Sequence, residues 1–181
     1  DQCEARVGDI RPWLDEPGAA DPRAPLHRLT LFATYRCQLQ CPYCRTPAWT
    51  AEDLRRFPQK GHAYDLGAFR TLLESLDGTP VRHLHATGGE ATLVPELPAM
   101  VRHARDNGIP HVSITSNGAT AWSQLEALVD GGLTEIRISV DAHEPVLGDQ
   151  LAGSAEAWRR AVANLEPLVR LRAVPPSFFL T

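Results

Sequence analysis

The sequence predicts an α/β protein, a partial (β/α) TIM-like barrel of parallel strands. Two observations support this fold class. β-rich segments alternate with amphipathic segments of about 10–15 residues, which is typical of βαβ units, and polar or glycine-rich residues follow each of the first four predicted strands. The chain has 181 residues, of which 43% are hydrophobic and 22% charged, as expected for one globular domain. Its net charge of -4 argues against a nucleic-acid or membrane-surface partner.

The first elements follow from local composition. Residues 1–26 are rich in Pro, Asp and Gly without periodicity, so we expect an extension or linker before a core at residues 27–181. Residues 28–34 predict a strand, and residues 45–64 a long loop with a short helical turn near 51–57. An apolar stripe then predicts a helix on Leu66, Phe69, Leu72, Leu73 and Leu76.

The strand–helix pattern repeats along the rest of the chain. Strands are predicted at residues 81–87, 111–116 and 135–140, with a possible fifth strand at 171–180. The intervening helices are predicted from three apolar stripes: Leu97, Met100, Val101 and Ala104; Trp122, Leu125, Leu128 and Val129; and Trp158, Val162, Leu165 and Val169. Because parallel strands end at one rim, where ligands bind in such folds, the polar strand ends should converge there.

Three of the four cysteines are clustered. Cys37, Cys41 and Cys44 have the spacing C-x3-C-x2-C, whereas Cys3 lies far upstream and is interpreted as an incidental thiol. A secreted disulfide framework would spread its cysteines, so this cluster favours the reducing cytoplasm. Three thiolates on one loop suit an iron–sulfur cube with one open iron. The alternatives are zinc, with Cys3 as a fourth ligand, or cysteines without a cofactor.

A thiol–disulfide oxidoreductase is a third alternative. The segment Cys41-Pro42-Tyr43-Cys44 matches the dithiol motif of glutaredoxins, in which a helix N-terminus activates the first cysteine. Thr79-Pro80 lacks the intervening Val of that family, however, and a glutaredoxin would not need Cys37.

Taken together, the motifs resemble the radical S-adenosylmethionine (radical SAM) superfamily over residues 28 to about 170. The specific pair is the three-cysteine loop, with Tyr43 before its last cysteine, and Gly88-Gly89-Glu90 after Thr87. Weaker motifs follow the next two strands, at Ser116-Asn117-Gly118 and Ser139-Val140-Asp141.

The resemblance implies a [4Fe–4S] cluster on Cys37, Cys41 and Cys44 whose open iron binds S-adenosyl-L-methionine (SAM). An electron from flavodoxin or ferredoxin would then drive reductive cleavage of SAM to a 5′-deoxyadenosyl radical. That radical would abstract hydrogen from a peptide or small metabolite. The cofactor-binding residues implied by the resemblance are Tyr43 beside the adenine, Gly88 and Gly89 for close backbone approach, Glu90 or carbonyls of its turn for the methionyl ammonium, and Ser116, Asn117 and Ser139 for the ribose or carboxylate.

The chain also departs from the family pattern. Ala91-Thr92 follows Gly88-Gly89-Glu90 where many relatives have Pro, and the sequence stops near a fifth strand although the family core has about six βα units, so we expect a truncated barrel. His85 and Thr30 stand where the molybdenum-cofactor cyclases have Arg, which argues against GTP as substrate. His85 is a catalytic candidate for substrate contact or proton transfer; a buried structural histidine is the simpler alternative.

Overall fold

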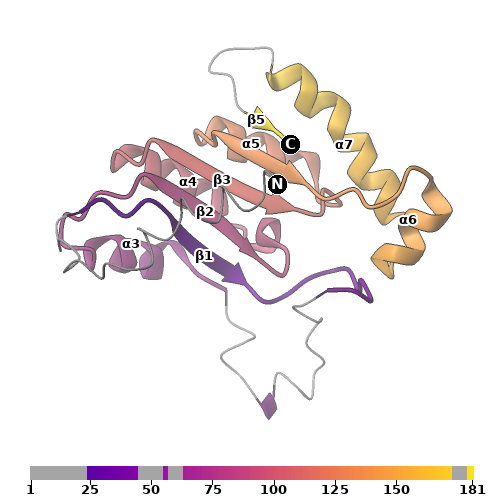
Figure 1. The fold of residues 1–181 in the computed structure, drawn as a ribbon, viewed down its shortest axis with the longest axis horizontal. Coiled ribbons are helices and arrows are strands. Elements are labelled where there is room, and N and C mark those ends of the chain that lie inside the picture. Colours follow the sequence, from indigo (N-terminus) through magenta and orange to yellow (C-terminus); the bar gives the residue numbers. More distant parts are fainter. Residues whose placement is uncertain (1–23, 45–54, 57–62, 173–178) are drawn as a thin grey trace, which may run out of the picture.

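The computed structural model describes residues 24–44, 55–56, 63–172 and 179–181. Its centre is a parallel sheet with the strand order β1-β2-β3-β4-β5 (Figure 1). The strands are β1 (Leu29–Thr34), β2 (His83–Gly88), β3 (His111–Ser116), β4 (Glu135–Ile138) and β5 (Phe179–Leu180). Within the described residues the sheet stays open, because β1 and β5 do not pair with each other. The predicted partial barrel of parallel strands is confirmed.

Helices follow the strands, as the alternating pattern predicts. Three of them, α3 (Leu66–Glu74), α4 (Leu97–Asp106) and α5 (Trp122–Asp130), lie together on one side of the sheet (Figure 1). All four residues of the apolar stripe predicted for α4 are buried, as are Leu125 and Leu128 of α5. The remaining elements are the short helix η2 (Ala91–Leu93), α6 (Pro145–Ala152) and α7 (Ala157–Arg172).

The two faces of the sheet differ in chemistry. On β2, Leu84 and Ala86 are buried in the hydrophobic core, whereas His83 and His85 alternate with them and occupy the opposite face. The register places His85 beside Ser113, and Ser113 beside Glu135. One face therefore packs on the helices, and the other carries a row of polar side chains.

The predicted face of α7 is wrong by one residue. Its buried positions are Ala157, Ala161, Asn164 and Leu168, each one residue before a member of the predicted stripe, and Val169 is 53% exposed. Small residues decide this orientation, because they allow close packing: a Cβ on Gly118 would lie only 3.2 Å from the Cβ of Ala161. One residue rotates a helix by about 100°, so the residues of the predicted stripe turn toward the edge of the interface.

The predicted fifth strand is also too long. Helix α7 continues to Arg172, and β5 comprises only Phe179–Leu180, while residues 173–178 lie outside the described range. Leu26 pairs with Val81, so sheet contacts begin before β1. Residues 1–23 of the predicted linker and most of the predicted loop at 45–64 lie outside the described residues; within that loop, residues 55–56 are helical.

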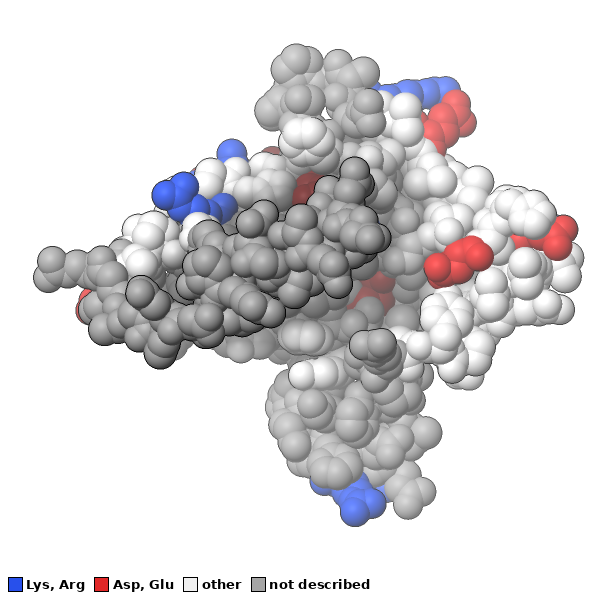
Figure 2. Space-filling view, in the orientation of Figure 1, with Lys and Arg blue, Asp and Glu red and all other residues white. Residues whose placement is uncertain are grey.

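Charged side chains are dispersed over the visible, described part of one face of the molecule (Figure 2). On the face drawn in Figure 2, the coloured basic residues stand apart and form no continuous patch, in keeping with the net charge of -4. Among the described helices, none has the length and apolar character required to cross a bilayer.

Candidate functional site

A cavity of about 270 Å³ lies at the carboxyl ends of the strands. It is lined by segments that follow β1, β2, β3 and β4, together with residues of α6 and α7. Every residue predicted to bind metal or cofactor lines it: Cys37, Cys41, Tyr43, Cys44, Gly88, Gly89, Glu90, Ser116, Asn117 and Ser139. The catalytic candidate His85 is absent from the lining. Four motifs spread over about a hundred residues of sequence thus meet at one site.

The three cysteines lie on the loop that leaves β1. Cys37 and Cys41 are half-buried and Cys44 is exposed, and none of the three is joined in a disulfide. The amide of Cys44 donates to the carbonyl of Cys41 (3.1 Å), which closes a tight turn between them. Burial raises the pKa of the Cys37 thiol, although the amide of Leu39 donates to its sulfur and opposes the rise. A bound cation is the usual way to favour the thiolate at such a site.

The three-cysteine donor set suits an iron–sulfur cube. No three His, Cys, Asp or Glu side chains in the described part of the chain are grouped to hold a single metal ion. Zinc requires its ligands around one centre, whereas the thiolates of a cube bind different irons and need not converge on one point. Cys3, the fourth zinc ligand considered above, lies outside the described residues.

The dithiol alternative depends on local helical structure. Glutaredoxin-like activation needs the first cysteine at a helix N-terminus. Pro42 and Tyr43 form a turn after Cys41, and no helix begins within the described residues 37–44.

Gly88 and Gly89 hold the cysteine loop against the end of β2. A Cβ on Gly88, whose φ is +139°, would lie 2.1 Å from the carbonyl oxygen of Thr34, and one on Gly89 would lie 2.3 Å from that of Arg36. The amide of Gly89 donates to Thr34 O (2.7 Å), and that of Glu90 donates to Arg36 O (2.8 Å). These glycines are thus required by the approach of the chain's own backbone; close approach to SAM stays a prediction.

Glu90 lines the cavity and holds neighbouring turns together through its hydrogen bonds. It is only 1% exposed, and both carboxylate oxygens accept hydrogen bonds from the protein. One oxygen accepts from the amide of Asn117 (2.8 Å), and the other from the amide (3.0 Å) and hydroxyl (2.6 Å) of Thr92. The side chain therefore ties the end of β2 to the end of β3. A contact of the methionyl ammonium with Glu90, or with the carbonyls of this turn, stays a prediction.

Asn117 links Glu90 to the cysteine loop. Its side-chain oxygen accepts from the amide of Ala119 (2.9 Å) and from the side chain of Gln38 (3.2 Å), and its Nδ2 lies 3.8 Å from the sulfur of Cys37. The neighbouring hydroxyl of Ser116 accepts from the amide of Gly118 (3.0 Å), which shapes the turn before α5. Both residues therefore have local structural roles in addition to lining the cavity.

The end of β4 meets the cysteine loop from the other side. The hydroxyl of Tyr43 donates to Asp141 (2.6 Å), and this hydrogen bond raises the pKa of the tyrosine. The amide of Ser139 donates to the carbonyl of Ser116 (2.9 Å), while its side chain is exposed toward the cavity. A ribose or carboxylate contact by Ser139 and an adenine contact by Tyr43 stay predictions.

Helix α6 supports the cysteine loop, and the apolar periodicity of the sequence does not predict it. The carbonyl of Ala152 accepts from the amide of Gln40 (2.9 Å) and lies 3.9 Å from the sulfur of Cys41. Gly153 ends the helix at a φ of +60°, and a Cβ there would lie 2.5 Å from the carbonyl oxygen of Gln40. Pro145 at the start and Gly153 at the end are the local signals that could have predicted this helix.

Comparison with known proteins agrees with the geometry. The family model described as the radical SAM superfamily matches residues 31–171. A curated PqqA peptide cyclase of Bradyrhizobium diazoefficiens is 33% identical over 130 residues, which are 72% of this chain and 32% of the relative. The chain thus spans about a third of that protein's length.

Solved structures show the same fold. SuiB of Streptococcus suis, crystallised with S-adenosylmethionine, superposes with a TM-score of 0.59 at 17% identity, over 87% of this chain and 40% of that one. SuiB bound to the precursor peptide SuiA gives a TM-score of 0.57 at 16% identity, with the same coverage. On the family match and the site geometry, this chain belongs to the radical SAM superfamily.

Proposed function

We propose that this chain is the cluster- and SAM-binding core of a radical SAM enzyme that modifies a peptide. The observation that carries the proposal is the meeting of the three-cysteine loop, Gly88-Gly89-Glu90 and the ends of β3 and β4 around one cavity. Family membership supports the cofactors, a [4Fe–4S] cluster and SAM.

The residues of the chain have distinct tasks in this proposal. Cys37, Cys41 and Cys44 hold the cluster, which together with SAM supplies a radical able to take hydrogen from an unactivated position. Glu90 and Asn117 fix the turns around it, because their hydrogen bonds join the ends of β2, β3 and the cysteine loop. The protein therefore contributes binding and orientation.

The peptide substrate is inferred from similarity. The curated relative is named a PqqA peptide cyclase, and the structural neighbour SuiB was crystallised with a precursor peptide. A small metabolite is the alternative. The cluster needs a one-electron reductant, for which we propose a flavodoxin or ferredoxin, and cysteines that must stay reduced suit the cytoplasm.

The decisive experiment measures iron and acid-labile sulfide after anaerobic reconstitution, then 5′-deoxyadenosine formed from SAM under reducing conditions. We expect about four iron and four sulfide per chain, their loss in Cys37→Ala, and no change in the matched control Cys3→Ala. Stoichiometric zinc that disappears in Cys3→Ala would instead establish the zinc site. A bound cluster without SAM cleavage would refute the radical SAM activity. Crosslinking or modification of candidate peptides then separates a peptide from a metabolite substrate.

A further inference from the structure

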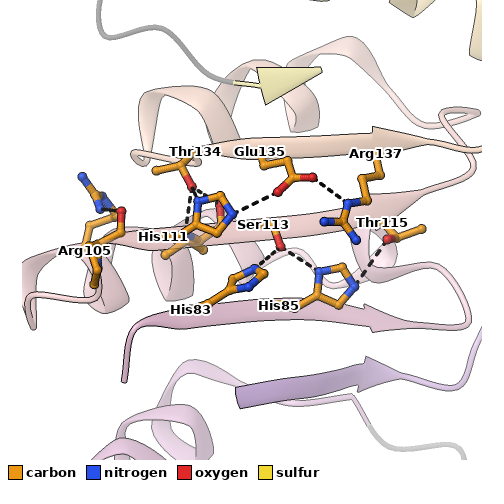
Figure 3. A network of polar contacts seen from close by, with 11 residues as sticks. His83, His85, Arg105, His111, Ser113, Thr115, Thr134, Glu135 and Arg137 are labelled. Carbon is orange, nitrogen blue, oxygen red and sulfur yellow. Dashed lines mark hydrogen bonds and ion pairs between the residues drawn. The ribbon is translucent and has the colours of Figure 1, made fainter. Parts of the chain in front are cut away.

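A continuous line of polar side chains lies on the sheet face opposite the helices (Figure 3). Ser113 Oγ lies 2.6 Å from Nε2 of His83 and 2.7 Å from Nδ1 of His85, and the other nitrogen of His85, Nε2, lies 3.4 Å from the hydroxyl of Thr115. We call Thr115, His85, Ser113 and His83, in this order, the histidine–serine chain.

The histidine–serine chain connects two regions of the molecule. Thr115 lines the cofactor cavity, whereas His83 is a half-buried residue at the start of β2. Between them, His85 is 5% exposed and Ser113 is fully buried. The ring of His83 lies 4.3 Å from that of His111, whose side chain is 34% exposed. One end of the chain therefore meets the cavity, and the other approaches solvent.

Counting hydrogens restricts the states of the chain. A serine hydroxyl has one hydrogen and can donate to only one of the two rings, and a neutral imidazole donates from one nitrogen and accepts at the other. If Ser113 donates to His85, then His83 donates from Nε2, and His85 in turn donates from Nε2 to Thr115. If Thr115 donates to His85, the directions reverse and both rings carry their hydrogen on Nδ1. In a continuous chain, the two histidines therefore share the same tautomer.

The surroundings keep both rings neutral near pH 7. Burial lowers the pKa of His85 to about 4, helped by the positive charges of Arg28 and Arg137. Burial, with His111, Arg28 and Arg137, lowers the pKa of His83, and Glu135 opposes the shift for both.

Glu135 is already engaged by two neighbours. One of its oxygens accepts from Arg137 Nε (2.6 Å) and the other from His111 Nε2 (3.0 Å), so both carboxylate oxygens already have partners outside the histidine–serine chain. The rings of His83 and His85 thus have Ser113 between them as a neutral partner.

We propose that the histidine–serine chain is a proton relay between the cofactor cavity and the solvent-facing start of β2. A group in the cavity gives a proton to Thr115 Oγ, which passes its own to His85 Nε2. His85 passes the hydrogen of Nδ1 to Ser113, which passes its own to His83 Nε2, and His83 releases the hydrogen of Nδ1 to water. One proton moves, no electron is transferred, and both rings change tautomer together.

The proposal rests on the proposed function only for the source of the proton, so its test needs no turnover. The measurement is 15N NMR of the protein labelled at histidine nitrogen, which distinguishes protonated from bare ring nitrogens. We expect His83 and His85 to show the same tautomer near neutral pH, with the hydrogen on Nδ1, because the relay starts from that state. A mixed pair, with His83 protonated on Nε2 and His85 on Nδ1, places two donors on Ser113 and would overturn the relay.

An acid titration tests transmission along the chain. Protonated His83 must donate from Nε2, so Ser113 must donate to His85, and His85 must then carry its hydrogen on Nε2. The Nδ1 resonance of His85 should therefore move as His83 titrates. His85 protonated on Nδ1 under these conditions would contradict the proposal.

Variants separate transmission from a general field effect. Ser113→Thr keeps the hydroxyl and should keep the coupled shift, whereas Ser113→Ala should reduce it by more than half. Ser75→Ala, an exposed serine on α3's C-terminal side, is the matched control and should leave the shift unchanged. An unreduced shift in folded Ser113→Ala would refute the relay, while absent SAM cleavage by the wild type would refute only the proposed function.

Discussion

Replacing Glu90 by Gln tests whether this carboxylate is a structural brace or only a ligand for SAM. The substitution keeps the size of the side chain but replaces one acceptor oxygen with an amide group that donates. Glu90 now accepts from Asn117 at 2.8 Å and from Thr92 at 3.0 and 2.6 Å, so the amide must face at least one donor. In the better orientation the remaining oxygen of Gln still accepts from Thr92, and its NH2 group faces the donating backbone amide of Asn117.

The expected loss follows from that orientation. A hydrogen bond to a charged group contributes about 1.5–3 kcal/mol, and the residue is 1% exposed, so water does not replace the partner. We expect the free energy of unfolding to fall by about 2–3 kcal/mol, a large part of the usual total of about 5–15 kcal/mol.

Urea unfolding of the protein without SAM and cluster measures this loss directly. The control is Glu126→Gln on α5, an exposed residue whose replacement should change stability by less than about 0.5 kcal/mol. If Glu90→Gln is equally neutral, the brace does not exist and the reasoning from its hydrogen bonds is refuted.

Two glycines that contact the cysteine loop, and the buried His85, give three further predictions. Gly89→Ala puts a Cβ 2.3 Å from Arg36 O, so it should lower the free energy of unfolding by about 1–3 kcal/mol and reduce the iron reconstituted per chain. The control variant Gly67→Ala on α3 should retain its iron. Gly153→Ala, 2.5 Å from the carbonyl of Gln40 at a φ of +60°, should likewise reduce the iron content, and full loading would show that α6 does not position the cysteine loop. Burial and nearby arginines lower the pKa of His85 from 6.5 to about 4. Because the unfolded chain therefore binds a proton at higher pH than the folded chain does, the free energy of unfolding should fall as the pH drops from 6.5 to about 4. His85→Gln should flatten that decline in urea unfolding between about pH 7 and pH 5, and an unchanged slope would contradict the assignment.

Helices α4 and α7 differ in how well apolar periodicity predicts the buried face. The stripe Leu97, Met100, Val101 and Ala104 identified the buried face of α4 correctly, because Arg102, His103, Arg105 and Asp106 leave no second face with large apolar side chains. Helix α7 has apolar residues on two adjacent faces, and the face with Ala157 and Ala161 is the buried one. Periodicity ranks residues by hydrophobicity, whereas close packing against Gly118 favours the smallest side chains.

The cavity also combines residues that a sequence motif identifies with contacts that only the folded structure shows. Glycines at the end of β2 were expected from the motif, but their need for space comes from the carbonyls of Thr34 and Arg36. The support of Cys41 by Ala152 joins positions 111 residues apart. A pattern in a short stretch of sequence cannot predict a contact between residues so far apart.

By itself, the sequence determined the parallel α/β fold and the rim where the motifs meet. These properties follow from periodicity, spacing and the direction of parallel strands, which are encoded locally. The tertiary structure decided which carboxylate oxygens of Glu90 are occupied, which face of α7 is buried and how Ser113 comes to lie between two histidines. Those outcomes depend on the register of strands distant in sequence, as in the pairing of His85 with Ser113, and on side-chain volumes that meet only after the chain has folded.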